Sequence, residues 1–226
     1  RDCLLSRGLG DVYKRQLLDS MNVWSQIDRN LLNHYGKTAP DDLTEQVKKM
    51  TIQQSAQYFI DRFQLPCQPE AFIALVQSMA ADAYRNTLQL KPGVFPLLDW
   101  LDARNVPYCV ATATYPDLAE AALKRLQVWE RIAFLMTEQE VGVGKSQPTI
   151  YRQAASRMGC GKRQTVVVED AVHAIETAAT DGFFTVGVYE PTLSEMDWNT
   201  IQAQATVSVK DLQKLLAEIQ SGRIPL

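Results

Sequence analysis

The distribution of apolar residues changes character near residue 88. Beyond that point, short apolar runs alternate with amphipathic segments. The apolar runs have the near-continuous pattern of strands covered on both faces, and they span residues 108–114, 132–139, 164–170, 183–189 and 205–209. Helical spacing marks the segments around them, at residues 94–105, 116–126, 147–159, 171–182 and 211–220. This alternation predicts an α/β fold in which a parallel sheet carries helices on both faces.

The part of the chain before residue 88 has a helical pattern without strands. Apolar residues recur on one face of three segments, at residues 22–36, 51–63 and 69–86. We therefore predict an all-helical domain over residues 21–87, with a hinge at 88–93. This domain would be inserted into a Rossmann-like α/β core made of residues 17–20 and 88–226.

Composition and charge narrow the function classes. The formal net charge is −3, from 23 basic and 26 acidic residues, and no basic block stands out, so nucleic acid is not an expected partner. No apolar run approaches the roughly 18 residues of a membrane span, so no membrane partner is expected. The four cysteines form no C-x-x-C pair, which indicates a reducing, cytoplasmic setting.

Polar side chains follow three of the predicted strands. Thr112 and Thr114 end the run at 108–114, Glu169 and Asp170 end the run at 164–170, and Lys145 follows the run at 132–139. In open parallel sheets, ligands bind outside the carboxyl ends of the strands. Two carboxylates and a lysine there would suit a Mg²⁺ ion and a phosphate group.

Each of these residues also has a purely structural interpretation. Asp170 could cap the helix that follows, with Glu169 favoured by the helix dipole. Lys145 could be a solvated loop residue, and Thr112 a threonine that merely ends a strand. A P-loop is excluded, because that motif requires Gly at position 139, where this chain has Gln139. Only the combination of the residues indicates chemistry.

That combination resembles the haloacid dehalogenase-like (HAD) hydrolases, in the branch with a helical cap that includes phosphoglycolate-phosphatase-like and β-phosphoglucomutase-like enzymes. VATAT (110–114), GKSQPTIY (144–151) and VVVEDAVHAIETA (166–178) are similar to the second, third and fourth motifs of that family. LLDSM (17–21) is similar to the residues that follow its first motif, and LKPG (90–93) to its return from the cap. The resemblance covers residues 17 to about 215.

The resemblance implies a role for each candidate residue. Thr112 and the amide of Ala113 would hold the phosphoryl oxygens, and Lys145 would offset their charge. Glu169 and Asp170 would hold Mg²⁺. The family's chemistry implies a phosphatase that acts on a small phosphorylated metabolite through an aspartyl-phosphate, as a monomer or homodimer. A phosphomutase needs the same residues and stays open.

The family's first motif, Asp-x-Asp-x-Thr, is missing. Counted back from Asp19, its positions fall on Val12, Lys14 and Gln16, and the chain contains no Asp-x-Asp elsewhere. Residues 1–16 lack Met and periodicity, so we expect a foreign segment in place of the first core strand, with natural loss of catalysis as the alternative. Either origin predicts a chain without turnover, and a non-catalytic phosphate-binding or interaction module stays open.

Overall fold

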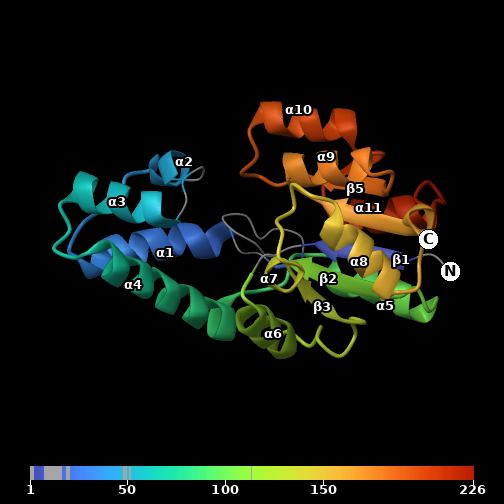
Figure 1. Cartoon of the computed structure of the whole chain (residues 1–226), viewed down its shortest axis with the longest axis horizontal. Coiled ribbons are helices and arrows are strands. Elements are labelled where there is room, and N and C mark those ends of the chain that lie inside the picture. The colour runs from blue at the N-terminus through green and yellow to red at the C-terminus, as the bar shows by residue number, and fades with distance from the viewer. Residues whose placement is uncertain (1–2, 8–16, 19–20, 48–49, 51, 113) are drawn as a thin grey trace. The chain divides into compact units, whose positions relative to one another are not determined.

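A parallel sheet forms the centre of the α/β part of the chain (Figure 1). The computed structural model describes residues 3–7, 17–18, 21–47, 50, 52–112 and 114–226. In these ranges the sheet has six strands in the order β3-β2-β1-β4-β5-β6, and every neighbouring pair is parallel. The strands are β1 (Cys3–Arg7), β2 (Tyr108–Thr112), β3 (Leu135–Thr137), β4 (Thr165–Glu169), β5 (Phe184–Val188) and β6 (Val207–Val209).

The central strand β1 lies where the sequence indicated no strand. Leu5 of β1 pairs with Cys109 of β2 on one side and with Val167 of β4 on the other. The sequence showed no strand pattern here, yet residues 3–7 occupy the central position of the sheet, and the origin of residues 1–16 stays a prediction. Positions Val12, Lys14 and Gln16 lie outside the described residues.

Helices cover both faces of the sheet, as the sequence predicted. They are α5 (Val94–Ala103), α6 (Pro116–Arg125), α7 (Glu138–Val141), α8 (Thr149–Arg157), α9 (Val172–Thr180), α10 (Glu195–Gln204), α11 (Leu212–Gln220) and the 3₁₀ turn η2 (Lys162–Gln164). Side chains alternate along β2, so that Cys109 and Ala111 pack with α8. Tyr108, on the opposite face, donates a hydrogen bond to Asp102 of α5.

Helix α10 was not predicted, and its packing depends on a glycine. Its sequence, EMDWNTIQAQ, has no one-sided apolar stripe. Of the described side chains of α10, Ile201 alone is fully buried. Gly187 of β5 lies directly beneath it, and a Cβ there would overlap Ile201 Cγ2 and lie 3.4 Å from Ala205 Cβ. Close approach of α10 to the sheet therefore requires glycine at this position.

An ion cluster at the end of α9 fastens three elements together. Arg152 of α8 donates from Nε to Asp181 Oδ2 at 2.9 Å, and Lys162 of η2 lies 2.8 Å from Asp181 Oδ1. The hydrogen bond from Arg152, opposed by burial and helped by Lys162, lowers the pKa of Asp181 to about 2. The cluster thus holds α8 and α9 together at the edge of the sheet where the strands begin.

The second part of the chain is helical in its described residues. It contains α1 (Met21–His34), α2 (Leu43–Val47), α3 (Ile52–Phe63), α4 (Pro69–Asp82) and a π-helical turn η1 (Ala83–Thr87). Its core joins Leu31 and Leu32 of α1 to Phe59 of α3 and Phe72 of α4, and the two phenylalanine rings lie 5.2 Å apart. The chain divides into two compact units, residues 1–19 with 89–226, and residues 20–88.

The two segments through which the chain leaves and re-enters the α/β unit are paired. Leu18 and Leu90 form an antiparallel bridge, and the amide of Lys91 donates to Leu17 O at 2.8 Å. Lys91 also forms an ion pair with Glu190, a buried residue just after β5. Both segments are therefore fastened to the edge of the sheet where the strands end.

None of the helices in the described ranges combines the length and the apolar character needed to span a bilayer.

Replacing Gly187 with alanine tests the contact between β5 and α10. We expect Gly187→Ala to lower the free energy of unfolding by about 1–3 kcal/mol, because Ile201 must move. The matched control is Gly161→Ala, where the nearest side-chain atom, Gln164 Oε1, would lie 3.5 Å from the new methyl group. Denaturant unfolding measures both, and equal stability of the two variants would contradict the proposed contact.

Candidate functional site

The end of β2 forms a tight turn at the carboxyl edge of the sheet. Thr112, the last residue of β2, is fully buried, and its Oγ1 accepts a hydrogen bond from the amide of Thr114 at 3.0 Å. This bond between residues i and i+2 is typical of threonine-stabilised turns. Ala113, whose amide was predicted to bind phosphate, lies outside the described residues.

The two acidic residues that follow β4 are both buried. Glu169 is 1% exposed and Asp170 is 5% exposed. The hydroxyl of Tyr151, from α8, lies 3.2 Å from Glu169 Oε1 and 3.1 Å from the carbonyl oxygen of Ala174, so it donates toward both. Tyr151 thereby fixes the orientation of the Glu169 carboxylate from the face of the sheet that α8 covers.

Asp170 directly precedes the N-cap residue of α9. The N-cap position of α9 is Ala171, whose side chain makes no cap hydrogen bond. Elsewhere in the chain, Asp211 is a true N-cap, because its Oδ1 accepts from the amide of Lys214 at 2.7 Å. Asp170 is therefore not the N-cap residue itself, and the two interpretations of this acid, helix capping and metal binding, both stay open.

Lys145 lies on a segment that is fastened at its base. Thr137 caps α7 by accepting from the amide of Glu140 at 3.1 Å. Glu138, the first residue of α7, accepts from the amide of Lys145 at 3.0 Å. Lys145 itself is half-buried rather than fully solvated.

The strand order brings these elements to one edge of the sheet. β2 and β4 flank β1 and run parallel to it, so Thr112 and Glu169 end at the same edge, one on each side of the central strand. β3 lies beside β2, so the segment that carries Lys145 begins at that edge as well. A cleft shared by all four side chains stays a prediction.

The donor atoms at this edge fit a magnesium ion. Mg²⁺ is a hard cation that proteins commonly hold with one or two carboxylates, leaving waters and substrate phosphate as its other ligands. Glu169 and Asp170 supply two buried carboxylates. Among the residues that the structure describes, no cluster of three or more His, Cys, Asp and Glu side chains is arranged to hold a metal.

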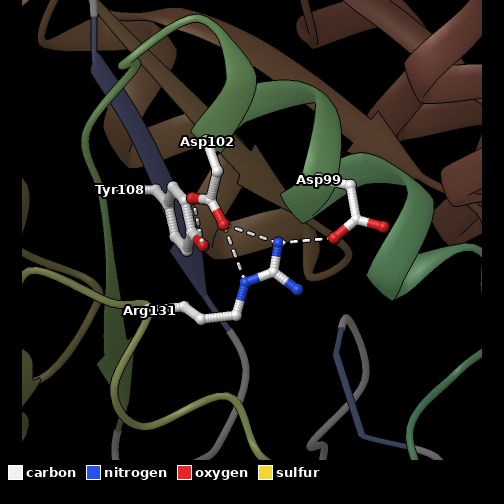
Figure 2. A network of polar contacts seen from close by, with 4 residues as sticks. All are labelled: Asp99, Asp102, Tyr108 and Arg131. Carbon is white, nitrogen blue, oxygen red and sulfur yellow. Dashed lines mark hydrogen bonds and ion pairs between the residues drawn. The ribbon is translucent and has the colours of Figure 1, made fainter.

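A second polar cluster lies at the opposite edge, where β2 begins. Figure 2 shows Arg131 between Asp99 and Asp102, with Tyr108 on the other side of Asp102. Arg131 Nη2 lies 2.7 Å from Asp99 Oδ1 and Nε lies 2.8 Å from Asp102 Oδ2, and Tyr108 donates to Asp102 Oδ1 at 2.9 Å. A cavity of about 500 Å³ adjoins Asp102, Tyr108 and Arg131.

The polar atoms of this second cluster are mutually satisfied. Burial, followed by the hydrogen bond to Asp102, raises the pKa of Tyr108. Burial alone would lower the pKa of Arg131, but its hydrogen bonds to Asp99 and Asp102 raise it above the usual value. Tyr108 therefore stays neutral and Arg131 stays charged near neutral pH, and the cluster connects the segment before β3 to α5.

Two buried polar residues of the carboxyl edge had no predicted role. Glu190 is 3% exposed and pairs with Lys91. Glu190 could have been found from the sequence, because it is an acid at the end of an apolar run (183–189), which is the pattern that identified Glu169. Thr114 is 5% exposed, and its Oγ1 has no hydrogen-bond partner among the described residues.

Comparisons with known proteins identify the family. The sequence profile described as "Haloacid dehalogenase-like hydrolase" matches residues 15–188. The chain therefore belongs to the haloacid dehalogenase-like hydrolases, as its motifs predicted.

Individual relatives are named as phosphatases. A Drosophila melanogaster protein named "Probable pseudouridine-5'-phosphatase" is 30% identical over 187 residues, which cover 79% of this chain and 80% of the relative. A Thermotoga maritima protein named "Phosphorylated carbohydrates phosphatase" is 22% identical, over 74% of this chain and 77% of the relative.

A solved structure from Thermotoga maritima, described as a "putative beta-phosphoglucomutase", has the same fold. Its TM-score is 0.84 at 21% identity, with 97% of this chain and 100% of that chain covered. The predicted α/β fold with a parallel sheet is thereby confirmed.

Asp28 of α1 gives the helical unit a testable pH dependence. Burial raises the pKa of Asp28 from 3.8 to about 7. The unfolded chain then loses this proton at lower pH than the folded chain, so stability falls as pH rises from about 4 to about 7. We expect Asp28→Asn to remove this decline, whose full size for a pKa raised from 3.8 to about 7 is on the order of 4 kcal/mol.

Denaturant unfolding at a series of pH values measures the effect of Asp28→Asn. Asp41→Asn, at an exposed position of the same unit, is the matched control. Parallel pH profiles for the wild type and Asp28→Asn would contradict the assignment of this decline to Asp28.

Proposed function

We propose that this chain has the architecture of a magnesium-dependent phosphatase for small phosphate monoesters. The observation that carries the proposal is the strand order, which puts the ends of β2, β3 and β4 at the same edge of the sheet, with the buried Thr112 and acidic pair at two of those ends. The phosphatase names of the relatives support the reaction class. The helical unit at residues 20–88 would select the substrate and exclude water, as lids do in many enzymes.

Each residue at this edge has a distinct proposed task. Thr112 donates a hydrogen bond to a phosphoryl oxygen, and Lys145 offsets the negative charge of the bound phosphate. Glu169 and Asp170 hold the magnesium ion, with Tyr151 orienting Glu169. When bound, the ion neutralises charge on the phosphoryl oxygens and orients the group for in-line attack.

The proposed site lacks an attacking group in this sequence. The motif positions counted from Asp19 hold Val12, Lys14 and Gln16, and none of these side chains can serve as a carboxylate nucleophile. The chain should therefore bind phosphate and magnesium without hydrolysing esters. A phosphate-binding module without catalysis is the second candidate function, and the absence of Asp-x-Asp from the sequence favours it.

Restoring the first motif tests the catalytic proposal. The variant combines Val12→Asp, Lys14→Asp and Gln16→Thr with apolar residues at positions 7–11, so that residues 7–11 can take the central place now held by residues 3–7 and position 12 can lie at the carboxyl edge. We expect it to hydrolyse a generic aryl phosphate in the presence of Mg²⁺, and the unaltered chain to be slower by a factor of at least about 10³.

The matched control carries Val12→Asn in place of Val12→Asp and keeps the other changes. It should be inactive, because the amide cannot attack phosphorus. Turnover by the unaltered chain would contradict its proposed inactivity. Failure of the restored variant to turn over, with retained phosphate binding, would favour the non-catalytic module.

Replacing Asp170 with asparagine tests the proposed metal site. Asp170→Asn should weaken magnesium binding at least about 10-fold, because the substitution removes a charged oxygen ligand. Asp211→Asn, at the true N-cap of α11, should leave magnesium binding unchanged, since asparagine caps helices as well as aspartate does. Isothermal titration with MgCl₂ measures both affinities, and equal affinities would remove Asp170 from the metal site.

A further inference from the structure

The end of β5 carries an exposed aromatic ring that has no part in the proposed function. Tyr189 directly follows β5, and 37% of it is exposed. Its ring packs edge to face against Trp198 of α10, with 5.2 Å between the ring centroids. Single exposed apolar side chains are common on protein surfaces, so the meaning of this ring depends on where it lies.

The strand register places Tyr189 beside the acidic pair. Glu169 of β4 lies directly opposite Gly187 of β5, so these two positions face the same side of the sheet. The amide of Tyr189 donates to Val209 O of β6 at 2.9 Å, so the strand geometry extends to this residue, which faces the same side as Gly187. A rise of about 3.3 Å per residue and a strand spacing of about 4.8 Å put the Cα atoms of Tyr189 and Glu169 roughly 8 Å apart.

Neighbouring contacts hold the Tyr189 ring in a fixed position. The chain turns directly after it, where the amide of Leu193 donates to Glu190 O at 2.9 Å. Ser194 then caps α10 with its side chain, and this cap fixes the start of the helix that carries Trp198. A ring that is already fixed in this way loses little conformational entropy when a ligand packs against it.

The position of Tyr189 suits the organic part of an ester rather than its phosphate group. A phosphate group held by Thr112 and the metal-binding pair is too small to extend to the end of β5 as well. In a nucleoside monophosphate, the sugar separates the base from the phosphate, so the base can extend to Tyr189. Flat rings of this kind stack favourably on the face of an aromatic side chain.

We propose that Tyr189 is a specificity-determining residue, whose ring stacks against a flat aromatic ring in the organic part of the substrate. The substrate class is then a phosphate monoester that carries such a ring, as a nucleoside monophosphate does. This inference rests on the proposed function and names the substrate class of the same site.

Two matched ligands isolate the contribution of the flat ring. Uridine 5′-monophosphate and ribose 5-phosphate share the phosphate group and the sugar and differ chiefly in the base. Isothermal titration of the full chain with MgCl₂ present should show uridine 5′-monophosphate binding about 10-fold more tightly, because stacking on an aromatic side chain contributes on that order. Tyr189→Ala should remove this preference and leave ribose 5-phosphate within about twofold, whereas Tyr189→Phe should keep the preference.

Tyr189→Leu separates recognition from a structural role. Leucine keeps apolar contact with Trp198 but has no flat ring, so this variant should unfold at a Tm close to that of the unaltered chain and still lose the preference. Thermal unfolding without ligand measures the Tm. If Tyr189→Ala and Tyr189→Leu weaken ribose 5-phosphate as much as uridine 5′-monophosphate, Tyr189 serves the structure of the site, and its proposed role is overturned.

Lys145→Met distinguishes failure of this inference from failure of the proposed function. If ribose 5-phosphate binds the unaltered chain and Lys145→Met weakens it, the phosphate site stands. Equal affinities of the unaltered chain for the two ligands, or a preference that survives Tyr189→Ala, would then overturn the role of Tyr189 alone. If the unaltered chain binds neither ligand, both proposals are overturned.

Discussion

The parallel pairing of β1 with β2 on one side and β4 on the other is the constraint on which the rest of this structure depends. Because the three strands run in the same direction, the residues that end them gather at one edge. Thr112 and the acidic pair at 169–170 are separated by more than 50 residues in the chain and by a single strand in the sheet. A shift of one residue in register would turn their side chains to the opposite faces. The position of the candidate site therefore depends first on how the strands pair and only then on the side chains at their ends.

Most of the α/β core could be predicted because its strands are buried on both faces. Such strands are apolar at most positions, and the runs at 108–112, 165–169 and 184–188 show this near-continuous pattern. β1 could not be predicted, since the segment CLLSR is short and ends in two polar residues. Its position in the sheet depends on two neighbours that lie more than 100 residues away. Helix α10 was missed because it has no one-sided apolar stripe, and its packing depends on the space that Gly187 of the preceding strand β5 leaves for Ile201.

For the candidate site as well, the local sequence predicted some features, whereas others depend on the packing of distant segments. Polar residues directly after apolar runs identified Thr112, Glu169 and Asp170, because strand ends in parallel sheets are where ligands bind. The sequence could not decide whether Asp170 caps a helix, and the structure gives that position to Ala171. Nor could it reveal that the Thr114 hydroxyl has no hydrogen-bond partner among the described residues, since the bonding of a buried group depends on everything packed around it.

The paired segments at Leu18 and Leu90 have a consequence for how such a protein can evolve. The bridge between them and the Lys91–Glu190 ion pair fix the exit and the return of the chain at one place. The residues between Leu18 and Leu90 form one inserted segment, and its length does not affect the order of the strands in the sheet. Loop closure depends only weakly on the length of such a segment. The intervening helices can accordingly be lengthened, replaced or reshuffled over generations, while the chemistry beside the strands is inherited intact.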